Sequence, residues 1–134
     1  MYSQSALTEA FENYQTAFAA LSPLVCYAVK ANGNLSIIKH FVSLGSGFDI
    51  VSGGELARIL AAGGDAAKTI FSGVGKSEAE IEFALHAGVK CFNMESIPEI
   101  DRIQKVAERL GSSICLISSV AFGIQYRVSC RIRV

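Results

Sequence analysis

One lysine stands where a short apolar stretch ends, a position in which an amine can take part in chemistry. Residues 24–31 are strand-like, and Lys30 lies at their end, before a loop with Asn32, Gly33 and Asn34. If this amine is buried, its charged form is disfavoured and its pKa falls, which suits a nucleophile or Schiff-base former. Alternatively, Lys30 marks the point where the strand reaches the surface and its ammonium extends into water. For the lysine taken alone, the second interpretation is the better one.

Polar residues also occur at the ends of the next three predicted strands. Asp49 lies inside the apolar segment 47–52, and polar segments 72–76 and 93–96 follow later strands. A carboxylate within a buried strand is costly unless it is paired or hydrogen-bonded. Active sites of parallel α/β proteins lie at the carboxyl ends of the strands. Asp49 therefore either binds a neighbouring loop amide or faces the same cavity as Lys30.

No other arrangement in the sequence indicates a catalytic centre. His40 and His86 lie in helical segments away from the strand ends, and neither a Ser/His/Asp set nor a metal-ligand cluster stands out. By elimination, the sequence points to an amine that can form an imine, with a carboxylate nearby. We therefore expect no metal site.

The strands alternate with helices at a regular interval. They are predicted to begin near residues 25, 47, 69, 90 and 114, at spacings of 22, 22, 21 and 24 residues. This alternation of apolar strands and helices predicts a parallel sheet buried on both faces. A doubly wound sheet shares most of the pattern, but no Gly-x-Gly-x-x-Gly follows a strand. We predict an α/β fold, a partial (β/α)8 TIM-type barrel.

Length limits how much of such a barrel the chain can form. A complete barrel takes roughly 250 residues, so 134 residues hold about five of the eight βα units.

Two helical features are specific enough to test. A helix over residues 5–21 carries one apolar stripe, and capping boxes are predicted at 77–80 and 96–99. The stripe consists of Leu7, Phe11, Tyr14, Phe18 and Leu21.

Composition excludes several classes of partner. Twelve Lys+Arg against twelve Asp+Glu give a net charge of zero, so no nucleic-acid partner is expected. Mean hydropathy is +0.38, but polar residues interrupt every apolar run well short of the roughly 20 residues that span a bilayer. The N-terminus does not resemble a signal peptide, and the four cysteines have no metal or redox spacing. We expect a cytoplasmic protein with reduced thiols and no membrane partner.

Four motifs in order carry a family resemblance over about residues 2–111. They are Tyr-Ala-Val-Lys-Ala-Asn at 27–32, Gly-Phe-Asp-Ile-Val-Ser-Gly-Gly-Glu-Leu at 47–56, Phe-Ser-Gly-Val-Gly-Lys at 71–76, and Phe-Asn-Met-Glu-Ser at 92–96. Together they resemble the diaminopimelate decarboxylase family, within the alanine-racemase-like class of pyridoxal-phosphate decarboxylases. The forms of the second and third motifs favour this family over ornithine and arginine decarboxylases.

The resemblance implies roles for three residues. It implies that Lys30 forms the Schiff base with pyridoxal 5'-phosphate, that Asp49 is the second-strand aspartate of the cofactor site, and that Glu55 is a nearby acidic group. The implied reaction, part of lysine biosynthesis, removes CO2 from a small amino-acid substrate, meso-diaminopimelate, and gives L-lysine. Intact family members are expected to be homodimers. The alternatives are an ornithine- or arginine-type decarboxylase, or a non-enzymatic half-barrel that pairs with another chain.

The C-terminal part departs from this family. Residues 1–112 are expected to form the N-terminal part of the pyridoxal-phosphate-binding barrel. Residues 113–134 are expected to hold a fifth strand and a divergent tail, for which we hypothesise a frameshifted or truncated gene product. The family's later segments, which include a cofactor-stacking histidine, a glycine-rich phosphate loop and a ring-nitrogen partner, have no counterpart in the sequence. We therefore expect no activity from the chain alone.

Overall fold

The computed structural model describes residues 2–112 and 115–118. Its helices are α1 (Gln4–Ala17), α2 (Leu35–Ser43), α3 (Gly53–Ala61), α4 (Glu78–Ala87) and α5 (Ile97–Leu110). Its strands are β1 (Cys26–Ala28), β2 (Gly47–Ile50), β3 (Thr69–Phe71), β4 (Cys91–Met94) and β5 (Leu116–Ser118). Short 3₁₀ turns occur at η1 (Ala19–Leu21), η2 (Val29–Ala31) and η3 (Ala66–Lys68).

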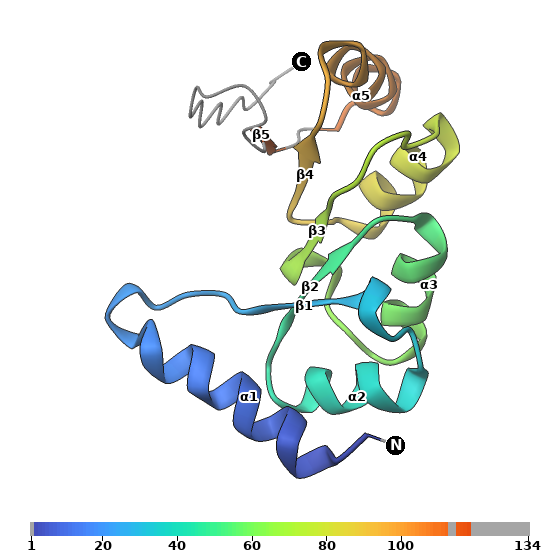
Figure 1. Ribbon diagram of the computed structural model, residues 1–134. Helices are drawn as coiled ribbons and strands as arrows, with labels where there is room; N and C mark the ends of the chain where they lie inside the picture. Colours follow the sequence, from blue (N-terminus) through green and yellow to red (C-terminus); the bar gives the residue numbers. More distant parts are fainter. Residues whose placement is uncertain (1, 113–114, 119–134) are drawn as a thin grey trace.

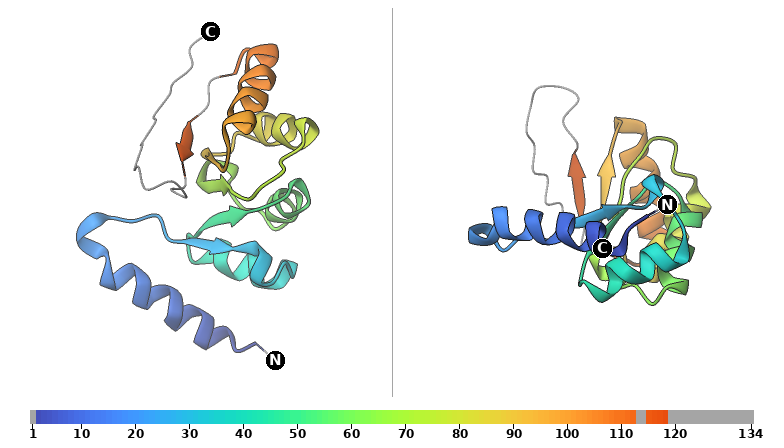
Figure 2. Two further views of the ribbon diagram at one scale, coloured as in Figure 1. Left: turned by 45° about the horizontal axis from the view of Figure 1, so that its top comes forward. Right: turned by 60° about the horizontal axis from the view of Figure 1, so that its bottom comes forward.

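The five strands form one sheet in the order in which they occur in the sequence. Every neighbouring pair is parallel, with Tyr27 beside Phe48, Ile50 beside Phe71, and Phe92 beside Leu116. Helices α2 to α5 lie in a row along one face of the sheet, while α1 lies beside β1 at one end (Figure 1). The views of Figure 2 show the same arrangement. The predicted parallel α/β sheet of about five βα units is confirmed.

The hydrophobic core lies between the sheet and the row of helices. Phe48, Ile50, Phe71 and Phe92 point from the strands into this layer and are at most 1% exposed. The Phe71 and Phe92 rings stack with centroids 5.5 Å apart. From the helices the layer receives fully buried aliphatic side chains: Ile38, Leu56, Ile59, Ile81 and Ile103.

Strand alternation sends the intervening residues to the opposite face of the sheet. Asp49 follows Phe48 and Asn93 follows Phe92, so both lie on the face that helices α2 to α5 do not cover. Apart from α1 beside β1, no helix of the described residues lies on this second face (Figures 1 and 2). In a closed barrel this face is the interior.

Two predicted elements are shorter than expected. The predicted strand 24–31 is a strand only at Cys26–Ala28, because the chain turns through η2, where the Tyr27 hydroxyl donates to the Asn32 carbonyl at 3.1 Å. The predicted helix 5–21 ends at Ala17, and η1 follows.

The apolar stripe of α1 is only partly used for packing. Phe11 is buried, whereas Tyr14, Phe18 and Leu21 are 62%, 49% and 76% exposed. The C-terminal end of α1 extends past β1, away from the other helices (Figure 1).

Tail residues 119–134 lie outside the described part of the chain. Within the described part, no helix combines the length and apolar character needed to cross a bilayer.

Two neighbouring thiols on the second face of the sheet are predicted to differ in reactivity. Burial is the main cause that raises the pKa of the Cys91 thiol to about 11, whereas Cys115, next to it across the β4–β5 pair, is exposed. Because the thiolate is the reactive form, iodoacetamide at pH 8 is expected to alkylate Cys115 roughly 100-fold faster than Cys91. Peptide mass mapping over time measures both rates, with guanidinium-unfolded chain as the control in which they converge. Equal rates in the folded chain would contradict the burial of Cys91.

Candidate active site

Lys30 lies in η2, two residues beyond the end of β1, and is exposed. The preceding strand places Ala28 directly beside Asp49 of β2, so the amine belongs to the same edge of the sheet as that carboxylate. Among the described residues, no ion pair joins Lys30 to Asp49. The buried lysine considered from the sequence is therefore not observed, and the alternative, an amine that reaches the surface, is what the structure shows.

Asp49 is held by a relay of polar side chains that crosses three strands. The Ser72 hydroxyl donates to Asp49 Oδ1 at 2.5 Å, and the Asn93 amide donates to Ser72 Oγ at 2.8 Å. All three side chains are half-buried on the second face of the sheet. The Asp49 carboxylate, which is costly within a strand unless it is hydrogen-bonded, thus receives its hydrogen bond from the end of the adjacent strand. Ser72 and Asn93 were recognised from the sequence as polar strand ends, but not as partners of Asp49.

Glu55 has a local partner in the loop after β2. Its Oε2 accepts a hydrogen bond from the Val51 backbone N–H at 2.7 Å, and its own N–H donates to Ser52 Oγ at 3.3 Å at the start of α3. The structure therefore brings Lys30, Asp49 and Glu55 to one edge of the sheet without direct contacts between their side chains.

Each of the first three loops at this edge is fastened to the helix of the following unit. Arg58 of α3 donates to the Gly33 carbonyl at 3.1 Å, and Glu80 of α4 accepts from the Gly53 N–H at 2.9 Å. In the third case Arg102 of α5 donates to the Lys76 carbonyl at 2.8 Å. These bonds couple neighbouring βα units through their loops.

The predicted capping box at 77–80 is confirmed, with Ser77 and Glu80 bonded reciprocally. The one predicted at 96–99 is wrong, because Ser96 makes no side-chain cap bond. Glu99 instead accepts from the Glu95 N–H at 2.8 Å and pairs with Lys76 at 3.0 Å. Sequence reasoning missed this buried pair, and the only local signal was an acidic residue at the third position of α5.

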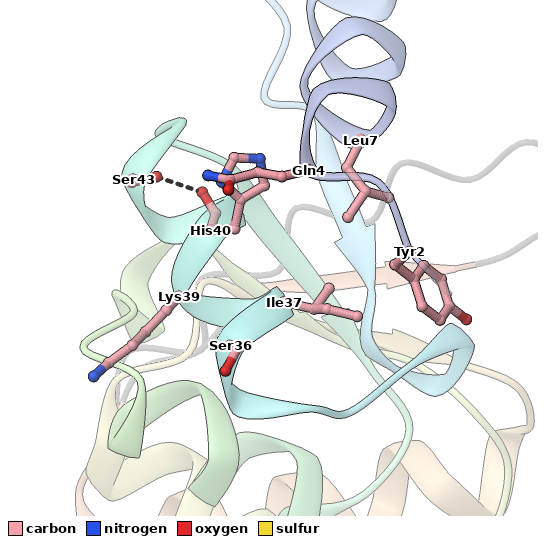
Figure 3. Close-up of a pocket in the computed structure, with 8 residues that line it drawn as sticks. All are labelled: Tyr2, Gln4, Leu7, Ser36, Ile37, Lys39, His40 and Ser43. Atoms are coloured by element: carbon pink, nitrogen blue, oxygen red, sulfur yellow. Dashed lines mark hydrogen bonds between the residues drawn. The ribbon is translucent and has the colours of Figure 1, made fainter.

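A separate cavity of about 380 Å³ lies between α1 and α2, away from the strand ends (Figure 3). His40 lies in this region with its ring 2.9 Å from Thr8 Oγ1 and 3.2 Å from Gln4 Nε2. The histidine therefore joins two helices, in agreement with its predicted place outside the active site. Within residues 2–112 and 115–118, no cluster of three or more His, Cys, Asp or Glu side chains is placed to hold a metal ion.

Comparison with known proteins assigns the class. The family described as "Pyridoxal-dependent decarboxylase, pyridoxal binding domain" matches residues 4–131, and the chain belongs to this family. Within it, diaminopimelate decarboxylases are close relatives. The chain is 92% identical to the diaminopimelate decarboxylase of Neisseria meningitidis serogroup B over 113 residues. These residues make up 84% of this chain and 27% of the relative. It is 52% identical over 111 residues to that of Vibrio cholerae, covering 83% of the chain and 27% of the relative.

Solved structures agree with this assignment. The diaminopimelate decarboxylase of Helicobacter pylori, complexed with L-lysine, matches with a TM-score of 0.85 and 43% identity over 87% of this chain and 30% of that one. An arginine decarboxylase of Paramecium bursaria Chlorella virus matches at 24% identity with a TM-score of 0.67, which shows the fold alone. The neighbours are TIM-barrel decarboxylases, so the predicted partial barrel is confirmed. The chain spans somewhat more than a quarter of the relatives' length.

Glu80 predicts how stability depends on pH. Hydrogen bonds from the Gly53 N–H, the Ser77 hydroxyl and the Ser77 N–H lower the pKa of this carboxyl below its ordinary value. The contribution of Glu80 is therefore present above the ordinary glutamate pKa and is lost as pH falls through the lowered one. Glu80→Gln is expected to lower Tm by roughly 4 °C at pH 7 and to lose less stability than the parent chain between pH 5 and pH 3.

Circular dichroism melts across this pH range measure the effect. Glu12→Gln, which changes an exposed α1 carboxylate, is the matched control and should follow the parent curve. A Glu80→Gln curve parallel to that of the parent chain would show that the loop tie does not favour the ionised carboxylate.

Proposed function

We propose that this chain forms the N-terminal part of the pyridoxal-phosphate-binding barrel of a diaminopimelate decarboxylase, with Lys30 as the residue that holds the cofactor. The observation that carries the proposal is the exposed Lys30 amine on the sheet edge that also holds the Asp49 relay. The 92% identity to the Neisseria relative over 113 residues supports the substrate assignment. We assign residues 1–112 to this barrel part.

The described residues fit the reactive end of such a cofactor. Lys30 offers a solvent-accessible amine, and Asp49 offers a carboxylate whose orientation is fixed by Ser72. When bound, pyridoxal phosphate supplies an electron sink for the electrons left by a departing carboxylate. Lys30 attaches and orients the cofactor, and Asp49 presents a negatively charged group on the second face of the sheet. Glu55 holds the loop between them and α3 in place through Val51.

The overall reaction in this proposal converts meso-diaminopimelate to L-lysine and CO2 in the cytoplasm, and the complete enzyme acts as a homodimer. The lysine bound in the Helicobacter pylori relative supports a product of this class.

Lys30 is expected to be the preferred site of attachment. Borohydride reduction in the presence of pyridoxal phosphate should label it about tenfold more than any of the other five lysines, as measured by peptide mass mapping. The other five lysines are Lys39, Lys68, Lys76, Lys90 and Lys105. Lys30→Gln is the control and should leave only weak, scattered label. Uniform labelling of the parent chain would count against a site at this edge.

A second role, that of a half-barrel completed by another chain, is favoured by the surface beside β1. Strand β1 is an edge of the described sheet, and beside it lies a cavity of about 450 Å³ whose lining carries no charged side chain. The lining combines one face of α1 with β1 and α2: Leu7, Ala10, Phe11, Tyr14, Val25, Cys26, Tyr27, Ala28, Ala31 and Phe41. An unprotected parallel edge next to apolar surface favours pairing with a further βα unit.

Complementation tests this role. The chain alone is expected to release no CO2 from meso-diaminopimelate, whereas mixing it with the remaining segment of the Neisseria relative should restore decarboxylation. Tyr14→Asp, at an exposed position of the apolar cavity, should abolish recovery. Leu60→Asp, on α3 and outside that cavity, is the matched control and should leave the recovery of decarboxylation unchanged. Equal recovery for both variants would exclude the β1 surface as the docking site, and a substrate panel with ornithine and arginine would separate the related activities.

A further inference from the structure

Lys76 is a buried cation at the carboxyl edge of the sheet. It follows the loop after β3 and immediately precedes Ser77, the N-cap of α4. Only 2% of the residue is exposed, and its ammonium lies 5.6 Å from the centroid of the Phe71 ring. Lysine is almost never fully buried unless it is paired, so its partners indicate what it does.

Three oxygen atoms from three segments surround the ammonium. Lys76 Nζ donates to the Gly73 carbonyl at 2.6 Å, the Asn93 carbonyl at 2.8 Å and Glu99 Oε1 at 3.0 Å. An ammonium has three N–H donors, and here each has an acceptor. The second oxygen of Glu99 accepts from the Glu95 N–H at 2.8 Å. The pair therefore fixes the loop after β3, the end of β4 and the first turn of α5 to one another.

Two of these contacts flank the relay that holds Asp49. Gly73 follows Ser72 directly in the chain, and Asn93 provides both the carbonyl that Lys76 binds and the amide that donates to Ser72. We infer that Lys76 is a positioning residue: its ammonium sets the separation of the β3 and β4 ends, and thereby the Asn93–Ser72–Asp49 relay beside Lys30. The consequence for the cofactor rests on the proposed function, whereas the effect on the relay does not.

The energetics of buried ion pairs favour this role over a purely stabilising one. Apolar residues of similar volume often replace such a pair without loss of stability, because the charges no longer have to be desolvated. A methionine in place of Lys76 fills similar space but offers no directional donors. Stability and relay geometry therefore respond differently when the pair is replaced as a unit, and this difference separates the two roles.

The test compares Lys76→Met/Glu99→Met with the parent chain and with Lys68→Met. Lys68 is exposed on η3 at the opposite end of β3, so this control removes one positive charge without touching the relay. The readouts are the thermal melt, the NMR signals and hydrogen exchange of the Asn93 side-chain amide, and the pyridoxal phosphate concentration that half-saturates Lys30 labelling.

The double variant is expected to melt close to the parent chain. Its Asn93 amide protons should exchange about tenfold faster and the half-saturating concentration should rise about tenfold, as for the loss of a hydrogen bond to a charged group. Parent-like values in a folded double variant would overturn the inference and leave Lys76 a structural role. If the double variant does not fold, Lys76→Arg decides, because it keeps a positive charge for Glu99 but changes the length and donor geometry of the side chain. A shifted Asn93 amide in this variant would support the inference, and an unshifted one would overturn it.

The two proposals fail separately. Unselective labelling of the parent chain would contradict the assignment of Lys30, whereas the Asn93 signals would still decide whether Lys76 positions the relay.

Discussion

The packing of one face of the sheet against helices α2 to α5 is the constraint on which the rest of the structure depends. Phe48, Phe71 and Phe92 occupy that layer, and each is at most 1% exposed. Because neighbouring residues of a strand point to opposite faces, the burial of these rings places Asp49 and Asn93 on the second face of the sheet. A shift of one residue in β2 or β4 would exchange an aromatic ring for a polar group in the core, at a cost of several kcal/mol. The position of the polar relay is thus a consequence of hydrophobic packing.

The sequence predicts this level of organisation well. Regular spacing and apolar periodicity gave the five parallel strands, and the motif at 77–80 gave a capping box that the structure contains. Lys30, Asp49 and the polar strand ends were correctly assigned to one edge. These features depend on local pattern and on the general geometry of parallel sheets, both of which can be read without knowledge of tertiary contacts.

The remaining features depend on partners distant in the sequence. Glu99 has the spacing of a capping residue, but a buried lysine 23 positions earlier takes its carboxylate. Tyr14, Phe18 and Leu21 continue the α1 stripe, yet no neighbouring element of the described residues covers them. The exposure of Lys30 follows from the early end of β1 and the turn through η2. In each case the outcome depends on residues too far apart in the sequence for periodicity and capping rules, which compare positions a few residues apart, to relate them.

The ties between each loop and the next helix have a consequence for the order in which the edge takes shape. Arg58, Glu80 and Arg102 each belong to the unit after the loop they hold. During synthesis from the N-terminus, the loop after β1 gains its tie only when α3 has emerged, and the loop after β2 waits for α4. At the carboxyl edge of the sheet, each of these loops is therefore fastened only after the helix of the following βα unit has been synthesised. Each of these three loops is thus completed by a helix of the unit that is synthesised next.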